Sequence, residues 1–137
     1  MSTQESRLPL ARKQNLIVKE LENEVMVYDS KRNKAFCLNQ TSGIVWKSCD
    51  GKTTVSDMTR ALRSIDSSVS DTVVWFALRQ LETDGLLEQN VSAPAETVGL
   101  TRKELVMKFG LAAAMVPLVA VLAAPAAAKV WSGPPPA

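Results

Sequence analysis

The stretch LNQTSGIVWKSCDGKTTVSDM, residues 38–58, decides the fold because it marks where strands end and helices begin. Within it, TSGIVWKSC places Ile44, Val45 and Cys49 on one helical stripe, and the glycine of the following DGK favours the left-handed backbone that ends a helix. Further on, Thr54 stands three residues before Asp57, the spacing of a capping box, in which each residue satisfies a backbone donor at the helix start. The stretch therefore predicts two short helices in succession.

Upstream of this stretch, the sequence predicts strands. The segments NLIVKEL (residues 15–21) and EVMVYDS (residues 24–30) are rich in β-branched and aromatic residues. Only Glu22 and Asn23 separate them, which indicates a tight hairpin. The turn SKRN then leads into KAFCLN, a third short strand closed by Leu38. We expect three antiparallel strands before the first helix.

Downstream, two helices follow with apolar residues at spacings of three and four. The second helix is expected to run to about Ile65 with this buried stripe: Val55, Met58, Leu62 and Ile65. The third begins after DSSVS, ends at Gly85 and carries a similar stripe: Val74, Ala77, Leu78 and Leu81. The predicted fold class is α+β, a winged-helix-like domain with a three-stranded antiparallel sheet followed by three helices.

Two segments together are similar to a known family. They are LNQTSGIVWKSCDGKTTVSDM and VVWFALRQLETDGLLEQ, residues 73–89. The residues that carry the likeness are Leu38, Asn39, Thr41, Val45, Trp46, Asp50, Gly51, Thr54, Val55, Leu81, Gly85, Leu86 and Leu87. They resemble the PqqD family, small peptide-binding chaperones named after pyrroloquinoline quinone biosynthesis. The matching elements cover residues 9–88 and do not extend to the tail.

The resemblance implies binding rather than catalysis. Members of the family hold a precursor or leader peptide and present it to a modifying enzyme, such as a radical maturase. An exposed third strand offers unpaired backbone groups to which an extended peptide adds as a further strand, and a neighbouring helix supplies a wall. The residues expected to bind the peptide are Ala35, Phe36, Cys37 and Leu38 on the strand and Val73, Phe76, Ala77 and Gln80 on the helix. Since Trp75 and Phe76 lie on opposite flanks of this helix, only one of them can face the groove.

The composition argues against catalysis, metal binding and nucleic-acid binding. The chain has no histidine and only two cysteines, Cys37 and Cys49, so a zinc site or a histidine-assisted nucleophile lacks its usual groups. We predict no catalytic residue, no metal and no cofactor. Through Ala95 the chain has 12 basic and 12 acidic residues. A winged-helix DNA-binding regulator is the less favoured alternative function, because such a protein needs cationic side chains facing phosphates and this domain is neutral; we therefore expect no nucleic-acid partner.

The chain divides by composition into four parts. Residues 1–7 form a polar leader expected to be disordered, and residues 8–90 form the peptide-binding domain. Residues 91–100 form a linker, and residues 101–137 form a basic and hydrophobic tail.

The tail has three interpretations. Residues 109–128 contain no charged residue, and as a helix they would span about 30 Å, enough for a bilayer core. Alternatively, TRK resembles a twin-arginine export motif with Lys103 in place of the second arginine, and APAAAK contains a cleavage pattern. Third, the tail is a precursor peptide fused to its own recognition domain, to be modified, exported or cleaved. We favour the first, a hydrophobic helical tail that holds a cytoplasmic domain at the membrane.

Overall fold

The computed structural model describes residues 8–89, 91 and 93–122, and its first elements are the three predicted strands. β1 (Leu16–Glu20), β2 (Val25–Asp29) and β3 (Lys34–Leu38) pair antiparallel in chain order. Side chains alternate across the sheet, so Val25, Val27, Phe36 and Leu38 are buried on the face toward the helices. Between them, Met26, Tyr28, Ala35 and Cys37 are half-buried on the outer face.

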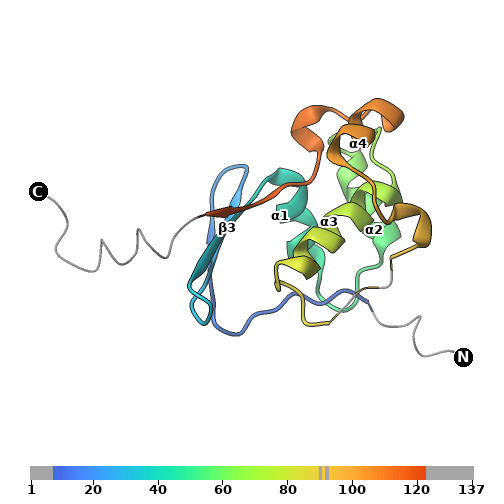
Figure 1. Ribbon diagram of the computed structural model, residues 1–137. Helices are drawn as coiled ribbons and strands as arrows, with labels where there is room; N and C mark the ends of the chain where they lie inside the picture. The colour runs from blue at the N-terminus through green and yellow to red at the C-terminus, as the bar shows by residue number, and fades with distance from the viewer. Residues whose placement is uncertain (1–7, 90, 92, 123–137) are drawn as a thin grey trace, which may run out of the picture.

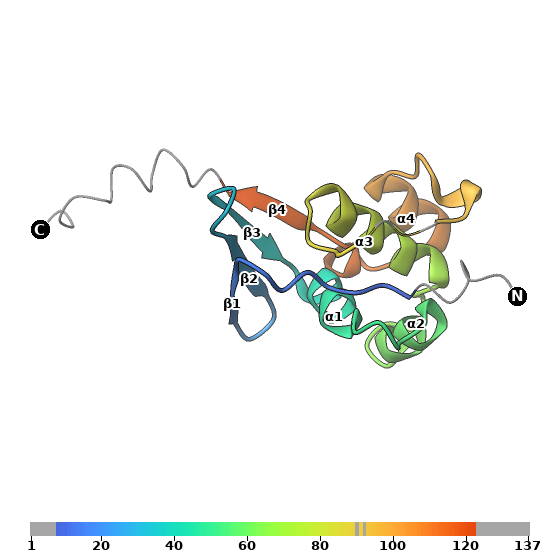
Figure 2. The ribbon, with the colours of Figure 1, turned by 90° about the horizontal axis from the view of Figure 1, so that it is seen from below.

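The sheet has a fourth strand, which corrects the prediction of three. β4 (Val119–Leu122) pairs antiparallel with β3, beside which it lies in Figure 1. The strand order of the sheet is β1-β2-β3-β4. Figure 2 shows the four strands side by side, with the helices gathered on one side of them. β4 comes from the hydrophobic tail, so the third strand is an internal strand of the sheet in this chain.

The three predicted helices are present, with small shifts at their ends. They are α1 (Gln40–Ser48), α2 (Val55–Arg63) and α3 (Asp71–Thr83). Both halves of the capping box between Thr54 and Asp57 are formed, and Asn39 caps α1 by accepting a hydrogen bond from the Ser42 amide. The predicted buried stripe of α3 is confirmed. On α2 the prediction fails for Ile65, because the helix ends at Arg63 and the Ile65 side chain is 47% exposed.

The region predicted as linker and tail folds against this domain. A 3-10 turn, η2 (Ala95–Thr97), is followed by α4 (Arg102–Phe109), a second 3-10 turn, η3 (Ala113–Met115), and then β4. Five apolar tail residues belong to the same buried core as the sheet and α3: Leu105, Leu111, Met115, Val116 and Val119. The described part of the tail therefore contributes apolar side chains to the core of the domain.

The predicted helix over residues 109–128 is also wrong for its described part. α4 ends at Gly110, which has the left-handed φ of 69° that stops a helix, and Pro117 prevents a new one from continuing. Residues 123–128 lie outside the described residues, as does the leader, residues 1–7. In the part of the chain that the structure describes, no helix combines the length and apolar character required to cross a bilayer.

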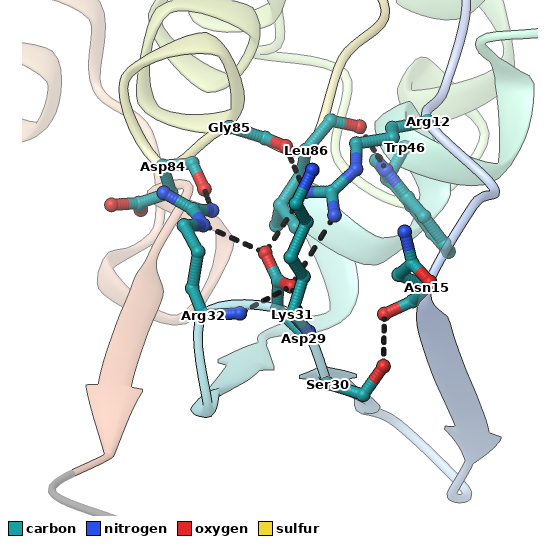
Figure 3. Close-up of polar contacts among 10 residues, drawn as sticks. All are labelled: Arg12, Asn15, Asp29, Ser30, Lys31, Arg32, Trp46, Asp84, Gly85 and Leu86. Carbon is teal, nitrogen blue, oxygen red and sulfur yellow. Dashed lines mark hydrogen bonds and ion pairs between the residues drawn. The ribbon is translucent and has the colours of Figure 1, made fainter. Parts of the chain in front are cut away.

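One buried carboxylate connects three separate segments (Figure 3). Asp29 is fully buried and receives hydrogen bonds from Arg12 Nη1 at 2.9 Å and Arg32 Nε at 2.7 Å. The same two arginines also donate to the main chain after α3, Arg12 to the carbonyl of Gly85 and Arg32 to that of Asp84.

Gly85 has a φ of 74°, and a Cβ there would lie 2.5 Å from Arg32 Nη2. This position therefore requires glycine.

The two guanidinium groups determine the charge state of Asp29. The hydrogen bond from Arg12 holds the pKa of this carboxyl well below its usual range, with Arg32 adding to the effect and burial opposing it. A carboxyl whose pKa is lower in the folded chain stabilises the fold above its unfolded pKa of about 3.9. That contribution is lost as the pH falls from there toward the folded pKa.

Replacing Asp29 with asparagine should lower the free energy of unfolding at pH 7 by about 3 kcal/mol, because two arginines lose their buried counter-charge. Urea unfolding measured at several pH values checks this. The wild type should lose stability between about pH 4 and pH 2, whereas the variant should lose less over the same range. Equal stability at pH 7, or parallel pH profiles, would contradict the structural role of this carboxylate.

Candidate functional site

The outer edge of β3, predicted from the sequence to accept a peptide, is where the tail pairs. Leu38 faces Val119, Cys37 faces Ala120, Phe36 faces Val121 and Ala35 faces Leu122. Just before β4, the Asn39 amide donates to the carbonyl of Leu118 at 3.1 Å. Because hydrogen-bonded pairs alternate along antiparallel strands, Cys37 and Ala120 form the next such pair. The backbone groups on this edge are thus engaged by an extended segment of the same chain.

Two side-chain amides, Asn39 and Gln80, hold the chain as it enters the strand, and we call this pair the amide clamp. Asn39 Nδ2 donates to the carbonyl of Val116 at 2.8 Å, and its Oδ1 accepts from the Leu118 amide at 3.1 Å. Gln80 Nε2 donates to the carbonyl of Pro117 at 2.9 Å. Its Oε1 accepts from the Val119 amide at 2.9 Å.

The clamp contacts only main-chain atoms. Any residue supplies the carbonyl groups, and any residue except proline supplies the amide groups. The clamp therefore recognises an extended backbone with little regard to its side chains. Arg102, which starts α4, adds a further hydrogen bond to the carbonyl of Pro117.

The side chains of β4 contribute little burial. Val119 is 8% exposed, whereas Val121 and Leu122 are 53% and 39% exposed. Ala120 is half-buried on the outer face of the sheet. The strand is therefore held mainly by backbone hydrogen bonds, with one aliphatic side chain inserted into the core.

The eight residues predicted to bind peptide fall into two groups. Four are buried in the core, so their side chains are not available to a ligand at the surface: Phe36, Leu38, Val73 and Ala77. The other four are half-buried: Ala35, Cys37, Phe76 and Gln80. The structure brings β3 and Gln80 together around the tail segment. Contact of these residues with a separate peptide stays a prediction.

Helical spacing separates the two aromatic residues of α3. Phe76 lies one turn before Gln80 and so shares its stripe. Trp75 lies one turn before Arg79, whose guanidinium donates to the carbonyl of Thr97 at 3.4 Å, toward η2. Phe76 is accordingly the aromatic residue on the side of the amide clamp.

Sequence reasoning missed Arg102 and the strand itself, and it placed Asn39 only among the residues that carry the family likeness. The signal for the strand was present in VPLVAVL, residues 116–122, where β-branched valines follow a proline. The absence of charge over residues 109–128, a run long enough to span a bilayer as a helix, led to a helical interpretation.

Both cysteine thiols have raised pKa values. Burial raises the pKa of the Cys49 thiol to about 12, and burial followed by Glu24 raises that of Cys37. Both thiols are therefore protonated at neutral pH and poorly nucleophilic. Among residues 8–122 as described, no three histidine, cysteine or acidic side chains are grouped so as to hold a metal ion.

Residues 24–87 match the family model described as coenzyme PQQ synthesis protein D (PqqD). Residues 24–87 therefore form a PqqD-like domain. The match covers β2, β3 and the helices α1 to α3, so the PqqD domain supplies the edge of β3 and Gln80, whereas α4 and β4 lie beyond it. No curated protein and no solved structure matches the chain.

Substituting Gln80 with leucine should release β4 locally, because the Pro117 carbonyl and the Val119 amide each lose a partner. A lost buried hydrogen bond costs about 1–3 kcal/mol, so the amides of Val119 and Ala120 should exchange with deuterium about tenfold faster or more. Amides of β2 should be unaffected. Glu82→Gln on the same helix is the matched control. Unchanged exchange in the Gln80 variant would show that the clamp does not hold the strand.

Proposed function

We propose that this PqqD domain binds an extended precursor peptide by strand addition on β3, beside α3, and presents it to a modifying enzyme. The PqqD match supports a peptide-binding role in the making of ribosomally synthesised, modified peptides. Members of this family are non-catalytic accessory proteins, and the proposed role of this domain is likewise binding. The modifying enzyme, of which a radical maturase is one kind, is part of the proposal.

The pairing of β4 with β3 is the observation that carries this proposal. It supports the view that the edge of β3 accepts an antiparallel strand and that Asn39 and Gln80 engage its backbone. Strand addition gives affinity through main-chain hydrogen bonds, and pockets for alternate side chains give selectivity. The single inserted side chain, Val119, indicates a pocket suited to an aliphatic residue.

A chain that ends at Pro117 opens the groove with little disturbance. Of the described residues removed, only Val119 is buried, and the apolar anchors Leu105, Leu111, Met115 and Val116 remain. The probe is a fluorescein-labelled peptide of sequence LVAVLAAP, residues 118–125, measured by fluorescence anisotropy.

The shortened chain should bind this peptide, and Gln80→Leu in the same chain should weaken binding by about tenfold, since the amide of the peptide valine that replaces Val119 loses its partner. Glu82→Gln should leave the affinity unchanged. Absence of binding by a shortened chain whose circular dichroism matches that of the full chain would reject strand addition at β3.

A further inference from the structure

The tail segment has the features of a ligand rather than of a structural strand. It lies outside the matched PqqD domain, and two side chains of that domain hold its backbone. Its last two residues are exposed, although a strand that served the core would bury alternate side chains. We infer that residues 116–122 are a tethered peptide ligand, supplied in cis, which fills the groove until it is displaced.

This inference rests on the proposed function and deepens it by naming the class of peptide. The segment VPLVAVL is uncharged throughout, and the clamp that holds it consists of two neutral amides. Proline fits at position 117, since the clamp uses only its carbonyl and no group awaits an N–H there. The groove therefore takes an uncharged extended segment that has an aliphatic residue two positions after the clamped carbonyl, and it tolerates proline at that carbonyl.

The anchor and the strand are separable. α4 and η3 place Leu105, Leu111 and Met115 in the core, so they keep the start of the segment in place while the strand leaves. A tether this short gives an effective concentration on the order of millimolar. A free peptide must compete with this tethered segment. If both bind the open groove with a Kd of about 10 μM, the effective concentration exceeds that Kd about a hundredfold, so the free peptide would bind the full chain about a hundredfold more weakly.

A native cysteine permits a direct test in the full chain. Cys37 faces Ala120 across the strand pair, and both lie on the half-buried outer face. Cα atoms in such a pair are about 5.5 Å apart, within the range that a disulfide spans. Ala120→Cys should therefore form a disulfide with Cys37 under mild oxidation at alkaline pH, at which the Cys37 thiol ionises. Val121→Cys is the matched control, since this residue faces Phe36 on the opposite face.

The crosslink distinguishes tethered binding from the alternatives. A monomeric species with altered mobility on a non-reducing gel, in Ala120→Cys but not in Val121→Cys, supports the inference. A disulfide-linked dimer would show that the segment fills the groove of a second copy, which overturns it. Failure to crosslink in a folded variant also overturns it.

Occlusion is then measured with the labelled peptide LVAVLAAP. Reduced Ala120→Cys should bind it about a hundredfold more weakly than the chain ending at Pro117, the oxidised form should not bind it, and reduction should restore binding. The wild-type chain gives the same comparison without any substitution. Equal affinities for the full and shortened chains would overturn the tethered ligand and leave the proposed function standing. A crosslink together with no peptide binding by the shortened chain would instead reject the proposed function and make β4 a structural strand.

Discussion

The buried carboxylate of Asp29 is the constraint on which the site depends. It ends β2, and its Oδ1 accepts the backbone amides of Lys31 and Arg32 at 3.1 Å, so it shapes the turn from which β3 starts. Through Arg12 and Arg32 it also fixes the main chain just after α3. The Asp29 carboxylate and its two arginines therefore connect β3, which forms the floor of the groove, to α3, which forms its wall. Arg32 adds a contact with the floor itself, since its guanidinium carbon lies 6.0 Å from the centre of the Phe36 ring.

Local signals in the sequence predicted the elements of the PqqD domain well. The third strand was predicted to close at Leu38, where β3 ends, and the capping box at Thr54 marked the start of α2. Such features are decided by neighbouring residues, which is why they can be read without a structure. The error at Ile65 is also local. The predicted end of α2 was about two residues too late, and helix ends commonly vary by one or two residues because the last turn competes with the following loop.

The fourth strand could not be predicted in this way. Alanine and valine around residue 119 suit a helix and a strand respectively, and strand propensity depends strongly on context. The choice is made by β3, which is far away in the sequence and offers a row of backbone donors and acceptors that a helix could not satisfy. For the same reason the candidate site was only half predictable. The edge and Gln80 followed from the family resemblance, whereas the pairing of Asn39 with the tail required the folded chain.

The position of Pro117 prevents β4 from shifting its register toward its C-terminus. If the strand slid toward its C-terminus by one residue, proline would occupy the place of Leu118, and Asn39 Oδ1 would meet a nitrogen without hydrogen. A slide of two residues would do the same to Gln80 Oε1. A slip by one would also turn every side chain of the strand to the other face. The clamp and the proline together thus fix the register of the tail. Each later residue lies at a set distance from Asn39 and Gln80, which grows by about 3.3 Å for every residue that stays extended.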